Sequence, residues 1–185
     1  SGHLPIAIPA LRGGQPGTYL APTLGWDSHG ISNLDPRPLY PFGFGLSYTS
    51  FRHFDAAVSA PTMSNDGSVD YAVTITNDGD RSGSDVVQLY LSDPWAEVVR
   101  PLKQLVGYVK VDLEPGESRR VTFTLHADRT SFIGTDHHRI VEPGEILLSV
   151  GHDSEDRLEP IAVEITGERR VVGEGRVLTT PVRLG

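Results

Sequence analysis

From Phe51 onward, apolar residues alternate with polar residues over short segments of the chain. A β-strand produces this period because successive side chains point to opposite faces of a sheet. The clearest segment is VDYAVTITN, residues 69–77, in which every second residue up to Ile75 is apolar. Further segments of this kind are FDAAVSA, DVVQLYLS, KQLVGYVKV, RRVTFTL, EILLSV and IAVEIT. About seven strands with turn signals between them, and no segment of helical period, predict an all-β protein built as a β-sandwich.

Two of the predicted turns share the sequence Glu-Pro-Gly-Glu, in LEPGES (113–118) and VEPGEI (141–146). Proline sets φ for the first central position of a turn, and glycine supplies the positive φ that the second position needs. Each turn directly precedes a predicted strand. We therefore interpret both as parts of the scaffold that carry no chemistry.

The composition excludes several classes of protein. The chain has 185 residues and a net charge of −8, and it has no basic stripe that could neutralise a phosphate backbone, so we expect no nucleic-acid partner. The absence of cysteine excludes disulfides, thiolate metal sites and cysteine nucleophiles. No apolar run approaches the ~20 residues of a membrane span, so we expect no membrane partner. The composition leaves a cytoplasmic and a secreted location equally open.

Residues 1–50 differ from the rest of the chain. They hold seven of the 14 prolines and eight of the 20 glycines, and within them only LPIAIP has the alternation of a short edge strand. Their aromatic and aliphatic content is nevertheless too high for a disordered tail. The segment ends in PLYPFGFGLSYTSF (38–51), with five aromatic residues and two glycines in 14 positions. We interpret residues 1–50 as an extended Pro/Gly-rich arm that lies on a partner surface.

Several long motifs, in this order, resemble the C-terminal region of glycoside hydrolase family 3 enzymes, the β-glucosidases, β-xylosidases and their relatives. These motifs are GHLPIAIP, GGQPGTYL, PLYPFGFGLSYTSF, VTITNDGDRSGSDVVQLYLSDP, RPLKQLVGYVKVDLEPGES and VEPGEILLSVG. The resemblance implies that residues 1–50 close an upstream α/β sandwich domain and form a linker. It implies a fibronectin type III-like (immunoglobulin-like) domain over residues 51–167 and a C-terminal tail over 168–185 that is a candidate edge strand.

The resemblance also gives the aromatic segment a role. Its rings would be buried at the seam between two domains, and the candidate packing residues are Tyr40, Phe42, Phe44 and Tyr48. Burial of one aromatic side chain contributes about 1.5–3 kcal/mol, so several could fix the orientation of the domains. The implied partners are the upstream catalytic domains. A β-linked oligosaccharide or glycoside would be reached only through the whole enzyme, which would release terminal β-linked glucose or xylose with retention.

No catalytic residue is expected within the chain. Retaining glycosidases use two carboxyl groups about 5–5.5 Å apart, and in family 3 the nucleophile belongs to an N-terminal barrel. Asp93 in LSDPWAE is followed by proline and ends a predicted sandwich strand, so we interpret it as a turn residue. Ser47 lacks the following glycine of a nucleophile elbow. GGQPG, residues 13–17, lacks the lysine and helix of a phosphate loop, so no cofactor is expected.

Two stretches contain residue types that bind metals, but neither is expected to bind one. Asp78, Asp80 and Ser82 match the first half of a calcium loop, but Leu89 stands where the closing glutamate belongs. In TDHHR, two neighbouring histidines of an extended segment would point to opposite faces. We interpret this segment as a polar loop tip, and His152 and Asp153 lie further along the chain.

Two rival functions remain open. An independent carbohydrate-binding module would stack flat rings against sugars, and the weak candidates for sugar contact are Trp26 and Trp95. Tyr108 is a further candidate, with packing in a strand as the alternative. A protein-interaction domain could share the same sandwich, because a fold alone does not give a function.

Overall fold

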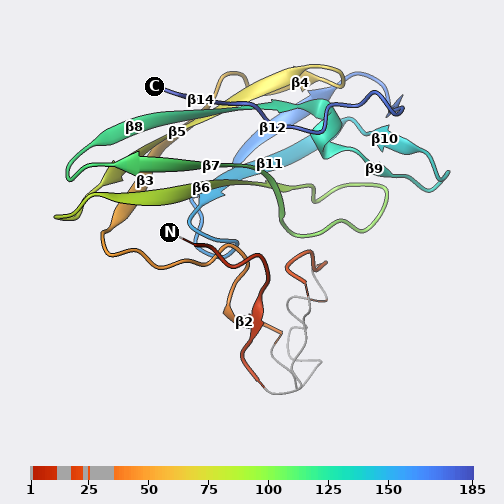
Figure 1. The fold of residues 1–185 in the computed structure, drawn as a ribbon. Helices are drawn as coiled ribbons and strands as arrows, with labels where there is room; N and C mark the ends of the chain where they lie inside the picture. The colour runs from red at the N-terminus through yellow and green to blue at the C-terminus, as the bar shows by residue number, and fades with distance from the viewer. Residues whose placement is uncertain (1, 12–17, 23–24, 26–35) are drawn as a thin grey trace.

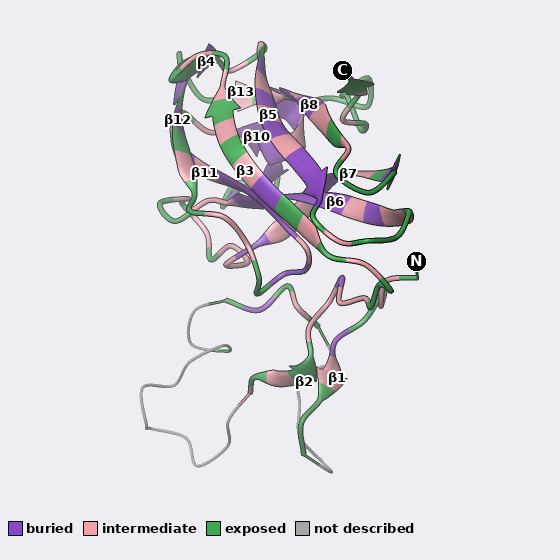
Figure 2. Cartoon of the chain, turned by 90° about the vertical axis from the view of Figure 1, so that its left-hand side faces the viewer, coloured by how far each residue is buried: buried purple, intermediate pink, exposed green. Residues whose placement is uncertain are grey.

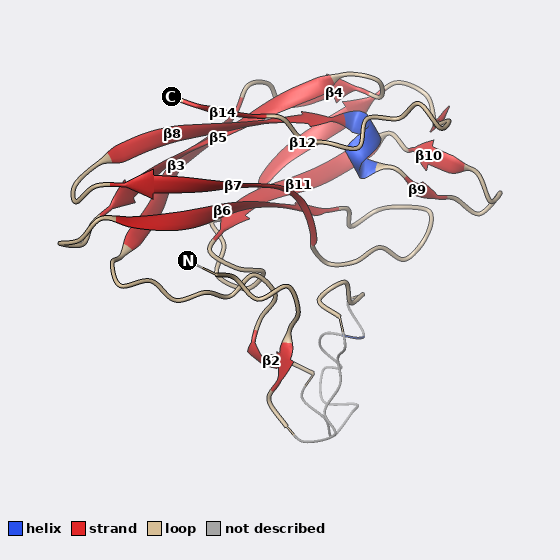
Figure 3. Cartoon of the chain, viewed as in Figure 1, coloured by secondary structure: helices blue, strands red, loops and turns tan. Residues whose placement is uncertain are grey.

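A computed structural model describes residues 2–11, 18–22, 25 and 36–185. Two main sheets pack face to face, and the short strands of the arm lie apart from them (Figures 1 and 3). The five-stranded sheet has the order β4 (Thr62–Ser64), β12 (Ile161–Thr166), β11 (Gly144–Gly151), β6 (Gly83–Ser92), β7 (Gln104–Leu113). The four-stranded sheet has the order β14 (Val182–Leu184), β8 (Ser118–His126), β5 (Ser68–Asn77), β3 (Phe51–Val58). The predicted β-sandwich is therefore confirmed, and each of the seven predicted segments contains a strand.

The core lies between the two main sheets (Figure 2). Because side chains alternate along a strand, every second side chain of each strand points into this core. On β5, Tyr71, Val73 and Ile75 are fully buried, and Phe123 of β8 is buried beside them. The facing side chains on β6 include Leu89, which is also fully buried. Because both sheets direct an apolar face inward, the sandwich removes these side chains from water together.

Smaller elements complete the part of the chain that the structure describes. A three-stranded sheet has the order β13 (Arg170–Val171), β10 (Arg139–Val141), β9 (Phe132–Ile133), and one 3-10 turn, η1, spans Ala127–Thr130. In the arm, β1 (Ile8–Pro9) pairs with β2 (Pro38–Tyr40). Among the described residues, no helix has the length and apolar character that crossing a membrane requires.

The strand predicted over LPIAIP is wrong for most of its length. The strand there is limited to Ile8–Pro9, although Leu4 does hydrogen-bond to the aromatic segment: its N–H donates to the Phe44 carbonyl at 2.8 Å, and its carbonyl accepts from the Gly43 N–H at 2.8 Å. Pro5 has no N–H with which to continue a ladder. The local alternation therefore does not set the backbone conformation here.

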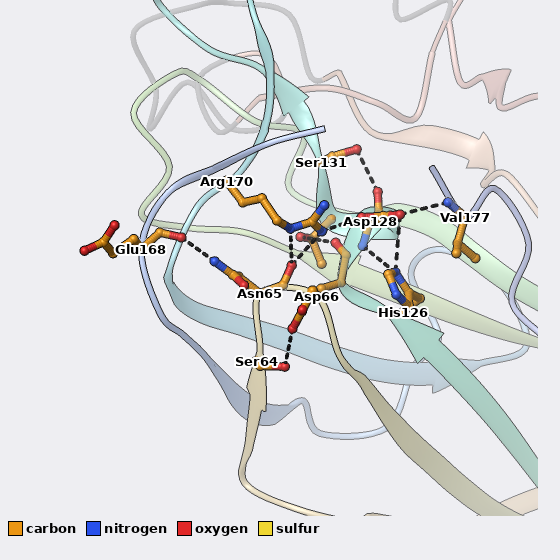
Figure 4. A network of polar contacts seen from close by, with 11 residues as sticks. Ser64, Asn65, Asp66, His126, Asp128, Ser131, Glu168, Arg170 and Val177 are labelled. Atoms are coloured by element: carbon orange, nitrogen blue, oxygen red, sulfur yellow. Dashed lines mark hydrogen bonds and ion pairs between the residues drawn. The ribbon is translucent and has the colours of Figure 1, made fainter. Parts of the chain in front are cut away.

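The C-terminal tail is held to the sandwich by a polar network around Asp128 in η1 (Figure 4). Arg170 donates to the Asp128 carboxylate and to the Asn65 carbonyl, and the Val177 N–H donates to Asp128 at 2.8 Å. Burial of the carboxyl would raise its pKa, but the bonds from Arg170 and Val177 outweigh burial and hold the pKa of Asp128 below its ordinary value. The tail then continues to β14, which pairs with β8 as an edge strand.

We expect Asp128→Asn to lower the free energy of unfolding by about 2 kcal/mol near neutral pH, since hydrogen bonds to charged groups are among the stronger ones. The folded-state pKa is depressed, so this contribution is present above the unfolded pKa of about 4 and is lost as pH falls through the folded value. Urea unfolding at several pH values between 3 and 7 measures it, with exposed Asp66→Asn as the control. A difference between wild type and Asp128→Asn that stays constant down to pH 3 would contradict the assignment.

Candidate functional site

The arm is hydrogen-bonded to one end of the sandwich. The Ser154 N–H donates to the Phe42 carbonyl at 2.9 Å, and Gln88 Nε2 donates to the Gly43 carbonyl at 3.1 Å. Gln88 is 3% exposed, and its side chain also donates to the His152 carbonyl and accepts from the Tyr90 hydroxyl. The arm therefore rests on groups from β6 and from the loop after β11, so its described part is no free tail.

Gly43 is needed at this contact for two reasons. Its φ of +83° is in the left-handed region that side chains with a Cβ rarely adopt. A Cβ on Gly43 would also stand 2.2 Å from Gln88 Oε1 and 2.9 Å from the Tyr90 hydroxyl. The glycine therefore allows the backbone to approach the sandwich closely.

The four candidate packing rings lie in one segment but differ in exposure. Phe42 stacks on Tyr19 with ring centroids 3.9 Å apart, and Tyr40 contacts Phe44 at 4.9 Å. Tyr40 nevertheless remains 43% exposed, and Tyr48 is 95% exposed. Other exposed apolar side chains of the arm are Ile6, Leu11, Leu20, Leu39 and Leu46. We call these exposed side chains, together with Tyr40 and Tyr48, the arm surface.

Of the two weak sugar-contact candidates, Trp95 lies among the described residues. Trp26 lies outside the described residues, and Trp95 is 78% exposed on the loop that follows β6. Residues 92–94, 96–102 and 147 line a cleft on this loop, with Trp95 outside its lining. Within it Asp93 lies 3.4 Å from Arg100, and burial raises the pKa of Asp93. Asp93 is thus the partner of an arginine in a surface loop.

The stretches tested as metal sites do not assemble one among the described residues. Asp78 pairs with Arg52 at 2.7 Å, and Asp80 is almost fully exposed. His138 lies 3.3 Å from Asp136, which also pairs with Arg169. The two stretches therefore form separate ion pairs, and their side chains do not converge on one point.

The structure instead assembles a polar cluster of His53, Asp85 and His152, which the sequence analysis missed. His53 Nε2 lies 2.6 Å from Asp85 Oδ2, and the two imidazole rings stack with centroids 4.0 Å apart. Burial lowers the pKa of His53, and the nearby Asp85 carboxylate raises the pKa of His152. The three residues come from β3, β6 and the residue after β11, so no local spacing could have grouped them; His152 alone had been singled out.

Comparison with known proteins agrees with this architecture. Residues 85–154 match the family model described as the fibronectin type III-like domain. The class of the protein is therefore a β-sandwich that carries a fibronectin type III-like domain.

The proteins similar to this chain include β-glucosidases and a β-xylosidase. The periplasmic β-glucosidase of Salmonella typhimurium is 39% identical over 163 residues, which cover 83% of this chain and 21% of that protein. A β-xylosidase of Formosa agariphila is 35% identical over 89% of this chain and 23% of its own length. A solved β-glucosidase from Erythrobacter marinus superposes with a TM-score of 0.81 at 37% identity, over 89% of this chain and 22% of that one.

The chain thus spans about a fifth of the length of the relatives that it matches. It corresponds to the C-terminal region of a family 3 glycoside hydrolase, including the fibronectin type III-like domain, as the sequence motifs indicate.

Proposed function

We propose that this chain is the accessory module that braces the catalytic domains of a family 3 glycoside hydrolase through the arm surface. The observation that carries the proposal is the state of the arm: its backbone is bonded to the sandwich, while Tyr48, Leu46 and Leu39 remain 95%, 79% and 58% exposed. Exposed apolar side chains gathered on one segment mark an interaction surface. The upstream catalytic domains are the proposed partner, and residues 1–50, 51–167 and 168–185 remain the proposed division of the chain.

The reaction of the whole enzyme is proposed from the names of the relatives, which are β-glucosidases and β-xylosidases. It is the hydrolysis of terminal β-linked glucose or xylose with retention of configuration. This reaction needs a nucleophilic carboxylate and an acid/base carboxyl about 5–5.5 Å apart. We assign both groups to the catalytic domains, so the chain alone is expected to be inactive.

The test separates the two parts of the parent enzyme. The catalytic region that precedes residue 1 in the parent polypeptide is produced separately and mixed with this chain, and activity on nitrophenyl β-glucoside and β-xyloside is followed. We expect each part alone to be weakly active or inactive and the mixture to regain activity. Tyr48→Ser should weaken assembly by about tenfold, which corresponds to the burial of part of one aromatic side chain.

Leu178→Ser is the matched control, because Leu178 is 59% exposed but belongs to the C-terminal tail. If Tyr48→Ser and wild type assemble equally well, the arm surface does not contact the catalytic domains and this part of the proposal is wrong. Saturable binding of xylo- or cello-oligosaccharides by this chain alone, abolished by Trp95→Ala, would instead favour the carbohydrate-binding module.

A further inference from the structure

The cluster of His53, Asp85 and His152 lies where the two main sheets approach each other beneath the arm. His53 is on β3, the edge strand of the four-stranded sheet, whereas Asp85 belongs to β6 and His152 follows β11 in the five-stranded sheet. One nitrogen or oxygen of each residue lies within 4.8 Å of the corresponding atoms of the other two. Three potential ligands from three elements therefore converge on one point.

Hydrogen bonding satisfies this cluster only in part. Asp85 Oδ1 accepts from the Val86 N–H at 2.9 Å, which leaves Oδ2 to face both imidazoles. His152 Nδ1 lies 3.6 Å from Oδ2, beyond hydrogen-bond length. His53 is 7% exposed, and its Nδ1 has no hydrogen-bond partner. Because His53 faces Asp85 through Nε2, an ion in the cluster would be bound by Nε2 and not by the unpaired Nδ1.

The ligand types select a class of ion. Two imidazole nitrogens and one carboxylate oxygen are the protein ligands of zinc sites that keep a fourth position open. Imidazole favours zinc, copper, nickel and iron, whereas magnesium and calcium prefer all-oxygen ligand sets. The composition of the cluster therefore points to a first-row divalent transition metal.

The site is reachable from solvent. Two surface clefts meet at His152: one is lined by His3, Phe44 and Asp85 among others, and the second by His53 and Leu158 among others. Asp156 lines both clefts, so a further carboxylate stands at the opening. It adds negative charge where a cation would enter.

Binding of an ion requires two rearrangements of the cluster. Zinc–nitrogen distances are about 2.0–2.1 Å, which requires the imidazoles to point at a common centre rather than stack. The His152 side chain is 34% exposed, whereas that of His53 is 2% exposed. His152 can therefore turn out of the stack toward the ion. His53 Nε2 and Asp85 Oδ2, now 2.6 Å apart, must also separate as bonds to the ion replace their hydrogen bond.

The geometry assigns to His53, Asp85 and His152 a binding site for a first-row divalent transition-metal ion at the seam between the arm and the sandwich. Because His3 and Phe44 of the arm line the same cleft, an ion bound there would also stabilise the contact between the arm and the sandwich. This site stands independently of the proposed function.

The experiment uses the full chain, free of affinity tags and stripped of metal, titrated with zinc in a calorimeter. We expect saturable uptake of one ion, little response to millimolar magnesium, and at least about tenfold weaker zinc binding by His152→Ala. His138→Ala is the matched control, since His138 is an exposed histidine beside an aspartate but lies outside the cluster. Its affinity should equal that of wild type.

A second measurement does not depend on a variant. In imidazole-detected NMR of the wild-type chain, zinc should shift the resonances of His53 and His152 and leave those of His138 in place. No saturable uptake at ~100 µM zinc would overturn the assignment, and so would equal affinity of His152→Ala and wild type or shifts confined to other histidines. In each of those cases the cluster is a hydrogen-bonded part of the scaffold.

Discussion

Replacement of Asn77 by alanine is expected to lower the free energy of unfolding by about 3–4 kcal/mol and the melting temperature by roughly 10 °C. Asn77 is fully buried at the end of β5, and its Nδ2 donates to the carbonyls of Arg81 at 2.7 Å and Leu113 at 3.1 Å. Its Oδ1 accepts from Thr49 Oγ1 and from the Gly79 N–H. The truncation leaves the Leu113 carbonyl unpaired in the interior, where such a group costs about 1–3 kcal/mol, and it removes three further hydrogen bonds that are partly buried.

Thermal and urea denaturation measure this effect, and a double-mutant cycle with Thr49→Val isolates one of the four bonds. We expect Thr49→Val to cost about 1 kcal/mol in wild type and nearly nothing in the Asn77→Ala background. Asn77→Asp serves as a second comparison, because it removes both donated hydrogen bonds and places a charge against two carbonyls. A loss below 1 kcal/mol for Asn77→Ala would show that water replaces the missing side chain.

The second large effect is expected from Gly43→Ala, which should release the arm from the sandwich. The substitution combines a strained φ of +83° with a contact of 2.2 Å to Gln88 Oε1. A loss of about 1.4 kcal/mol from the free energy that holds the arm on the sandwich raises the population of the released arm tenfold. We therefore expect cleavage within residues 36–50 to become at least tenfold faster in limited proteolysis. The sandwich should remain folded.

Gly116→Ala separates the effect of backbone strain at a positive φ from the effect of a steric clash by the added Cβ. Gly116 has a φ of +74° in the LEPGES turn, but a Cβ there would have nothing within 4 Å. This control should lose about 1–2 kcal/mol of global stability through strain alone and leave proteolysis of the arm unchanged. Equal proteolysis of both variants would mean that the contact with Gln88 does not hold the arm.

These predictions bear on the proposed function because the arm surface is useful for docking only if the arm is held in place. Gln88, Ser154 and Asn77 secure the polypeptide on either side of Tyr48. A partner that binds the exposed side chains then meets a segment already ordered, and less conformational entropy is lost on association. Release of the arm by Gly43→Ala is therefore expected to weaken assembly with the catalytic domains as well.

Much of the fold could be predicted because its signals are local. In VDYAVTITN the buried residues Tyr71, Val73 and Ile75 follow from alternation alone, and the Pro-Gly pair at 115–116 announces a turn with positive φ. The strands that were missed, such as β4, β9 and β13, contain two or three residues each, too few for a period. They form because an adjacent strand of the sheet offers hydrogen-bonding partners: β12 for β4, and the three-residue β10 for β9 and β13.

The two-sheet sandwich, the change of pattern near residue 51 and the family to which the motifs point can all be inferred from the amino-acid sequence, because each depends on residues that are neighbours along the chain. The tertiary structure alone decided that Gln88 holds Gly43 and that Thr49 binds Asn77. It also decided that His53, Asp85 and His152 meet. The physical reason is that these contacts join strands distant along the chain. Their geometry depends on how two sheets and an arm pack, which no short window of residues records.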